Sequence, residues 1–371
     1  MGIKDLGTFI KNEEIDCQFE LPLTYFSGTA WGIDALNWIY TYKTTCVKNI
    51  LNKKGRSLFD PIEPDDLGKE LEKQVYYFNK KLMDCNITPI WIWDGESQDN
   101  KVATQEERRK EREKGWKKHK ELEAQLKEKD EMELTPLERK RWNNSLATHT
   151  KLPFEKVERV KVMTEKLGVP TITSDDEGEN LAASLSVERK VSLVWSTDTD
   201  NYPLGSIKVG NKGFITKKGI PYIKGVEPHK VVKHLRMDFK TFRDMCIMFG
   251  TDFNQRIRGV GTKTSLKLIR TYGSLEKIEE ETCHNLTFWN YPFVRKQLTP
   301  YSTFFQTNIH LKPRRCHDPE MIDMLRKDYP HLDLYEFLSS LNDIRHVDCF
   351  SPMRSLSSPE RIVVNDSDSD D

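Results

Sequence analysis

The sequence lacks long apolar runs, paired cysteine motifs and an excess of either charge. No apolar stretch approaches the roughly 20 residues that cross a membrane, so we expect no membrane-spanning segment. Residues 1–11 carry too few apolar side chains for a secretory signal peptide. Lysine plus arginine and aspartate plus glutamate each number 58. Net charge therefore points to no class of partner, and a nucleic-acid surface would have to come from segregated charge.

The seven cysteines are scattered along the chain, and no two form a C-x-x-C pair. This usage predicts free thiols in a reducing intracellular compartment rather than a disulfide framework. It also argues against a zinc site, because structural zinc is usually held by clustered cysteine and histidine.

Four strand-like runs alternate with helical patterns along this chain of 371 residues, at 29–33, 87–93, 169–173 and 191–195. An apolar content of 37% allows a sizeable core. Strands that alternate with helices predict an α/β fold with a mostly parallel central sheet flanked by helices.

Acidic residues follow these strand-like runs or open the next helix. Because the carboxyl ends of parallel strands meet at one edge of a sheet, we expect acids from distant positions to converge there. Each acid alone has another explanation, since an aspartate at a strand end often caps a helix or forms a turn. The seven candidates are Asp34, Asp94, Glu177, Glu179, Asp198, Asp200 and Asp252.

A cluster of this kind predicts a metal site. Neighbouring carboxylates raise one another's pKa unless a cation neutralises them. All of the candidate ligands are hard oxygens, which favours Mg²⁺, with Mn²⁺ as a substitute, over zinc. A pair of such ions is a common solution for hydrolysing phosphodiester bonds.

The segment 98–142 is dominated by alternating charge, EERRKEREKGWKKHKELEAQLKEKDE, which predicts an exposed helix. Both of its ends must return to the sheet edge that carries the acids, so we expect an arch that is mobile without nucleic acid. It has little apolar surface of its own. The alternative is a solvated spacer helix.

A helix–loop–helix pattern occupies 239–272. Gly259 and Gly261 let the backbone approach a phosphate closely, and the helix that follows offers free N–H groups. Lys263, Lys267 and Arg270 would add salt-dependent phosphate contacts. The alternative is an ordinary tight turn between helices.

Taken in order, these motifs resemble the XPG-type nuclease family, and most closely flap endonuclease. The resemblance covers roughly residues 1–275, and Gly178 stands where the family's E-A-E motif has alanine. The motifs are MGIKDLGTFI, GIDALNWIY, PIWIWDG, DEGENLAASL, STDTD and FGTDFNQRIRGVGTKTSLKLI.

The resemblance implies a PIN-like 5′-nuclease fold with a helical arch and a helix–two-turn–helix. It implies a structure-specific 5′ nuclease, either a flap endonuclease or a 5′–3′ exonuclease, that acts on DNA flaps, nicks or free 5′ ends in replication, repair or recombination. It also implies two metal ions and a potassium ion at the helix–two-turn–helix. One metal ion would be held by Asp34, Asp94, Glu177 and Glu179, and the other by Asp198, Asp200 and Asp252.

Further roles follow from the same resemblance. Lys101 and Arg108 would hold the scissile phosphate, Tyr40 would stack on a substrate base, and Gly2 would lie where the N-terminus meets DNA. The alternatives are surface charge for Lys101 and Arg108 and core packing for Tyr40.

The resemblance divides the chain into an N-terminal nuclease region (1–97), an arch and linker (98–150) and an internal nuclease region (151–275). A helical extension (276–358) and a disordered acidic tail (359–371) follow. No sliding-clamp peptide is recognisable. We expect a monomer in the nucleus, or in a host's nucleus if the divergence reflects a large DNA virus. A silent DNA-junction scaffold and a nuclease for RNA 5′ ends remain alternatives.

Overall fold

The computed structural model describes residues 2–53, 55–95, 102–256, 259–282, 284, 286, 290–301 and 319–343. For residues 102–108, 111 and 319–321 it describes the backbone alone. Lys101 and the acidic tail therefore lie outside the described residues. No helix in these ranges is both long enough and apolar enough to span a bilayer.

A sheet that has eight strands within the described ranges forms the centre of the fold, in the order β1-β8-β6-β5-β2-β3-β4, with β7 paired to β8. The five strands from β4 to β6 run parallel, and β8 is antiparallel to β1, β6 and β7. The expected α/β fold with a mostly parallel centre is confirmed. The strands are β1 (Gln18–Pro22), β2 (Thr29–Asp34), β3 (Ile87–Trp93), β4 (Thr171–Thr173), β5 (Leu193–Trp195), β6 (Val209–Gly210), β7 (Ile215–Lys217) and β8 (Ile220–Val226).

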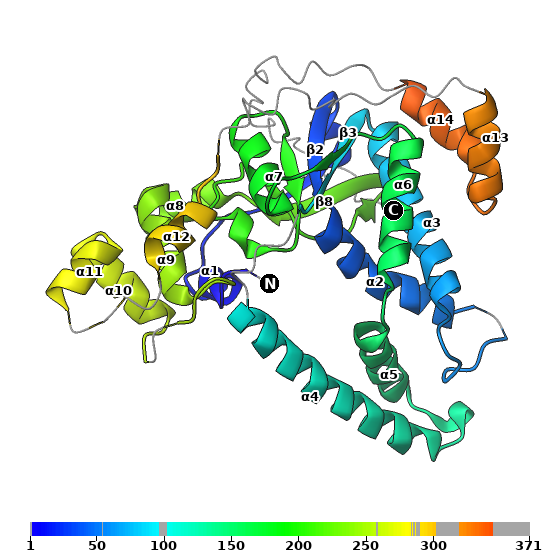
Figure 1. Ribbon diagram of the computed structural model, residues 1–371, viewed down its shortest axis with the longest axis horizontal. Coiled ribbons are helices and arrows are strands. Elements are labelled where there is room, and N and C mark those ends of the chain that lie inside the picture. The colour runs from blue at the N-terminus through cyan, green and yellow to red at the C-terminus, as the bar shows by residue number, and fades with distance from the viewer. Residues whose placement is uncertain are drawn as a thin grey trace, which may run out of the picture.

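Helices cover both faces of this sheet (Figure 1). On β3, Ile90 and Ile92 pack against α7, while Trp91 and Trp93 join the core under α2, α3 and α6. This alternation is the period of two that a strand buried on both faces requires. The helices nearest the sheet are α2 (Ala35–Leu51), α3 (Pro64–Asp84), α6 (Phe154–Lys166) and α7 (Gly178–Val187).

A second core joins the N-terminal helix to the helices that follow the sheet. In Figure 1 this group extends to the left of the sheet, and it includes the two helices of the predicted helix–two-turn–helix. It consists of α1 (Leu6–Asn12), α8 (Pro228–Leu235), α9 (Phe239–Phe249), α10 (Thr262–Tyr272), α11 (Leu275–Glu281) and α12 (Tyr291–Gln297).

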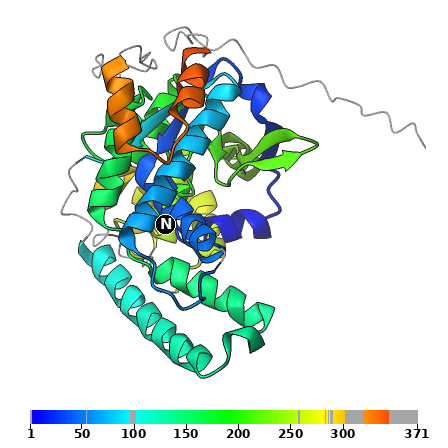
Figure 2. The same cartoon turned by 90° about the vertical axis from the view of Figure 1, so that its right-hand side faces the viewer.

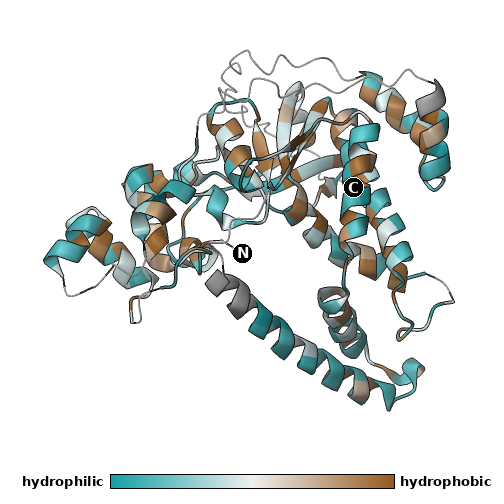
Figure 3. Cartoon of the chain, in the orientation of Figure 1, coloured by the Kyte–Doolittle hydropathy of each residue, from teal (hydrophilic) through white to brown (hydrophobic). Residues whose placement is uncertain are grey.

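The charged segment forms a helical hairpin of α4 (Val102–Lys127) and α5 (Pro136–His149). The hairpin stands away from the sheet in both views (Figures 1 and 2), and most of α4 is hydrophilic (Figure 3). The expectation that this segment has little apolar surface was wrong at the turn of the hairpin. There Leu126, Leu134 and Trp142 form a small core with Leu58 from the α2–α3 connection. The Trp142 indole N–H donates to the Leu58 carbonyl at 2.9 Å.

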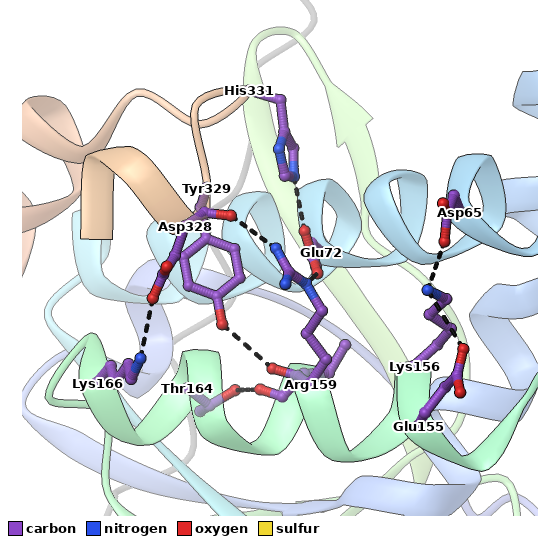
Figure 4. Close-up of polar contacts among 11 residues, drawn as sticks. Asp65, Glu72, Glu155, Lys156, Arg159, Thr164, Lys166, Asp328, Tyr329 and His331 are labelled. Atoms are coloured by element: carbon purple, nitrogen blue, oxygen red, sulfur yellow. Dashed lines mark hydrogen bonds and ion pairs between the residues drawn. The ribbon is translucent and has the colours of Figure 1, made fainter. Parts of the chain in front are cut away.

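Two C-terminal helices, α13 (Pro319–Asp328) and α14 (Leu334–Asp343), dock on α3 and α6 through an ion-pair network (Figure 4). The Glu72 carboxylate is buried, and it accepts from Arg159 Nε at 2.5 Å and lies 2.8 Å from His331 Nε2. Arg159 Nη2 donates to the Asp328 carbonyl at 2.6 Å. Burial raises the pKa of Glu72, and the Arg159 hydrogen bond opposes that rise.

Arg159→Met should destabilise the fold because it removes the guanidinium that pairs with the buried Glu72 carboxylate. We expect a loss of roughly 1–3 kcal/mol in the free energy of unfolding, below the 3–5 of fully buried pairs because Arg159 is 45% exposed. Urea denaturation measures this loss. The double variant Glu72→Gln/Arg159→Met should recover most of it, and no recovery would mean that arginine packing, not charge, is what matters.

Candidate active site

The carboxyl ends of the parallel strands bring acids together at one sheet edge. Asp34 ends β2 and caps α2, where its Oδ1 accepts from the Asn37 N–H at 3.1 Å. Its Oδ2 accepts from Ser196 Oγ at 2.9 Å, and the same hydroxyl oxygen accepts from the Asp198 N–H at 3.1 Å. Ser196 follows β5 and is fully buried, so it ties the acids of two neighbouring strands into one arrangement.

Asp94 follows β3 and is bound to the start of α7. Its Oδ1 accepts from the Gly178 N–H at 2.7 Å. A Cβ built on Gly178 would lie 2.8 Å from that oxygen, so any larger residue would have to push the carboxylate away.

The remaining acids meet beside this pair. Glu179, Asp198 and Asp200 each offer a carboxylate oxygen within 4.8 Å of the others. A recess of about 30 Å³ is lined by Glu177, Glu179, Asp200 and Asp252. Acids from the start of α7, from the segment after β5 and from the loop after α9 are therefore held together beside Asp34 and Asp94.

The electrostatics of this edge show how closely the acids are placed. Burial raises the pKa of Asp34 to about 8, the Asp94 charge adds to the rise, and the hydrogen bonds from Asn37 and Ser196 oppose it. Burial, followed by the charge of Asp198, raises the pKa of Glu179 well above its usual value. Carboxylates in this condition either take up protons or bind a cation.

The residues fit a divalent metal ion. Every side chain in the group is a carboxylate, and hard oxygen donors suit ions such as Mg²⁺, Mn²⁺ and Ca²⁺ rather than zinc. The acid edge is thus a candidate metal centre.

Gly2 lies against these acids. Its φ is +89°, and a Cβ there would fall 1.9 Å from Asp198 Oδ1 and 2.9 Å from Thr199 Oγ1. The structure packs Gly2 directly on the acid cluster, and its expected position beside the DNA stays a prediction. Only glycine satisfies both the left-handed backbone and the close approach.

The loop before α10 has the open geometry that a phosphate contact needs. Gly259 has φ +82°, and a Cβ at Gly259 or Gly261 would meet nothing within 4 Å. Lys263, Lys267 and Arg270 are exposed and, at a spacing of four and three residues, share one face of α10. The opposite face is buried in the second core.

Of the three remaining predicted residues, the structure describes the side chain of one, Tyr40. Tyr40 projects from α2 and is 49% exposed, so the alternative of core packing does not apply to it. Arg108 lies in α4, but only its backbone is described, and Lys101 lies outside the described residues.

Sequence reasoning missed residues from the C-terminal extension. Gln297 and Leu298, at the end of α12, line the acid recess. Asn180 Nδ2 holds that turn in place by donating to the Gln297 carbonyl at 3.0 Å. Helices α10, α11 and α12 lie between Asp252, the last predicted acid, and Leu298, and nothing in the sequence near α12 signals this return to the site.

Two family models match the chain and together cover more than half of it. The XPG N-terminal domain matches residues 1–115, and the XPG I-region matches residues 168–252. The chain belongs to the XPG family of nucleases. All seven acids fall within these two ranges, and Asp252 is the last residue of the second, so the matched segments of this XPG-family chain supply the whole acid edge.

Curated relatives agree with the family models. Flap endonuclease 1 of Debaryomyces hansenii is 27% identical over 323 residues, which is 84% of this chain and 80% of that protein. Flap endonuclease 1 of Methanobrevibacter smithii is 28% identical over 333 residues, 89% of this chain and 91% of that protein.

Solved structures agree in fold. Flap endonuclease-1 from Methanococcus jannaschii superposes with a TM-score of 0.57 at 20% identity, covering 88% of this chain and 96% of that one. The catalytic core of Rad2 in complex with DNA substrate gives a TM-score of 0.58 at 15% identity, covering 93% of this chain and all of that one.

Gly2→Ala should lower the rate of DNA cleavage by roughly 100-fold, because the new methyl group displaces Asp198 by about an ångström or more. Single-turnover cleavage of a flapped DNA measures the effect. Gly7→Ala is the matched control, since a Cβ at Gly7 meets nothing within 4 Å and alanine suits a helix. Equal rates for both variants would show that the contact between Gly2 and Asp198 is unimportant for the reaction.

Proposed function

We propose that the chain is a divalent-metal-dependent, structure-specific 5′ nuclease that cuts DNA at 5′ flaps, nicks or free 5′ ends. Its context would be DNA replication, repair or recombination. The observation that carries the proposal is the convergence of seven acids on one sheet edge in a chain of the XPG family. Relatives over most of the chain are named flap endonucleases.

The proposed cofactor is a pair of Mg²⁺ ions, for which Mn²⁺ can substitute. One ion would be held by the acids around Asp34 and Asp94 with Glu177 and Glu179, and the other by Asp198, Asp200 and Asp252. When bound, such ions supply activation of the attacking water and stabilisation of charge on the attacking and leaving oxygens. The chain's own contribution is orientation, since Ser196, Asn37 and the α7 N-terminus fix the carboxylates before substrate arrives.

Three further residues have proposed roles in substrate handling. Lys101 and Arg108 would hold the scissile phosphate and oppose its developing negative charge. Tyr40, half exposed on the helix that Asp34 caps, is available to stack on a substrate base. The hairpin of α4 and α5 would let a free 5′ strand pass and exclude a blocked one.

We place the duplex on the loop at Gly259 and Gly261 and on the basic face of α10. The exposed N-terminus of this 11-residue helix favours phosphate through its free N–H groups and dipole. A potassium ion in the same loop is part of the proposal.

The remaining parts of the proposal concern the protein's setting. We propose a monomer that works without a sliding-clamp peptide, in a reducing compartment such as the nucleus, including a host's nucleus for a viral protein. The four cysteines that the structure describes are free, which is compatible with that setting.

Asp198→Asn should reduce the rate of Mg²⁺-dependent flap cleavage by well over 100-fold, whereas loss of a residue that only supports a metal ligand typically costs up to about 100-fold. Binding of the flap should persist. The amide keeps the oxygen that accepts the Asp200 N–H at 3.2 Å, but it removes the charge that would hold the ion. Electron paramagnetic resonance of bound Mn²⁺ should show weaker binding, and the melting temperature without divalent ions should rise.

Asp16→Asn, on an exposed acid away from the recess, is the control and should behave as wild type. If Asp198→Asn cleaves at the wild-type rate, or binds Mn²⁺ as tightly as the wild type, the metal assignment is wrong. Tight flap binding with no cleavage by the wild type would favour a silent scaffold, and preferential cutting of RNA 5′ ends would favour the RNA nuclease.

Lys263→Ala combined with Lys267→Ala should weaken duplex binding and make its salt dependence shallower by about 0.9 for each lost contact. The chemical step should be unchanged once substrate is saturating. Fluorescence anisotropy against salt concentration measures the slope. The control combines Lys69→Ala with Lys73→Ala. It removes an equally spaced pair of lysines from α3, which lies across the sheet from α10 (Figure 1). An unchanged slope in the α10 variant would show that the duplex lies elsewhere.

A further inference from the structure

Trp116 is a large side chain that remains 47% exposed on α4. It lies just outside both segments that match the family models, so the family likeness assigns it no role. Its ring centroid is 5.3 Å from that of His119, at an interplanar angle of 33°, and 5.9 Å from that of His149 on α5. The hairpin therefore supports one side of the indole and leaves nearly half of its surface open.

The support behind Trp116 is rigid. His119 is buried, its ring stacks on that of Trp142 at 5.1 Å, and its Nδ1 lies 2.9 Å from Ser145 Oγ. A Cβ built on Gly115 would come within 2.9 Å of His149, so the two helices are in close contact at this level. An aromatic ring fixed in this way binds a ligand without losing much side-chain entropy on association.

Cations share the side of α4 that carries the ring. Arg109, Arg112 and Lys120 lie seven and four residues before Trp116 and four after it, which places them along the same side of α4. Lys120 Nζ is 5.1 Å from the indole centroid and 2.7 Å from a Glu123 carboxylate oxygen. A fixed aromatic ring with a row of cations is the chemistry of single-stranded nucleic-acid binding, in which bases stack on rings and phosphates meet cations.

We propose that Trp116 is a stacking platform for a base of the single strand that passes along α4. This inference rests on the proposed 5′-nuclease function. On binding, the base takes the place of the Lys120 ammonium over the indole, and that ammonium pairs with a neighbouring phosphate. Trp116 lies roughly 20 Å along the helix axis from Val102, so it meets flap nucleotides well away from the cleaved bond.

The test compares 5′ flaps of equal length and charge that either carry bases throughout or are abasic only in the nucleotides that can reach α4, so the base proposed to stack on Tyr40 is present in both. Anisotropy of the full-length protein in EDTA should show the base-bearing flap binding about tenfold more tightly. Trp116→Leu, which keeps apolar volume for the hairpin, should remove that preference. Trp116→Phe should retain most of it, and a flap too short to reach α4 should show no preference in any variant.

Leu137→Ala is the matched control, because Leu137 is an exposed apolar residue of the same hairpin, 66% exposed on α5. It should keep the wild-type preference. Two results would overturn the proposal: a Trp116→Leu variant that still prefers bases, or a Trp116→Phe variant that loses the preference as completely as Trp116→Leu. The second result would assign the ring to hairpin packing. Cleavage by the wild type with Mg²⁺ is measured separately, so a failure of the nuclease proposal can be distinguished from a failure of the stacking proposal.

Discussion

Mutual repulsion among carboxylates is the constraint on which the arrangement of this fold depends. Asp34 and Asp198 are buried at an edge where like charges crowd together, and each is held by hydrogen bonds from its surroundings. Burial and neighbouring charge raise the pKa values of Asp34 and Glu179, so without a cation the site costs stability. The rest of the molecule supplies the packing that offsets this cost.

The packing comes from segments far apart in the chain. The parallel strands set the positions of the acids, and the second core holds the helices that close the recess. Arg295 fastens α12 to this core, with its guanidinium 2.7 Å from buried Asp244 and 2.7 Å from Glu276. Because α12 ends at Gln297, this ion pair also fixes a wall of the acid site.

The sequence predicted helices and strands correctly where a short stretch of residues determines the structure. The buried runs that became β2 and β3 are continuous and apolar, and the charged run that became α4 has the composition of an exposed helix. The position of the acids followed from a topological rule about strand ends. The strands β1, β6, β7 and β8 were missed because they are short or carry proline, glycine and lysine, which weaken a strand pattern. The contacts of Gly2 with Asp198 and of Gly178 with Asp94 depend on backbone placement, which no local pattern reveals.

The hairpin is supported unequally along its two legs. Lys43 of α2 donates to the carbonyls of Thr148 and Thr150 at the end of α5, at 3.2 and 2.9 Å. In its middle, α5 is bound to Leu58 through Trp142. The α5 leg is therefore a bracket fixed at two points to the helix that carries Asp34 and to its connection. Since His119 of α4 packs on Trp142 and lies 2.9 Å from Ser145 Oγ, both of α5, the α5 leg sets the position of the whole hairpin relative to the acid edge.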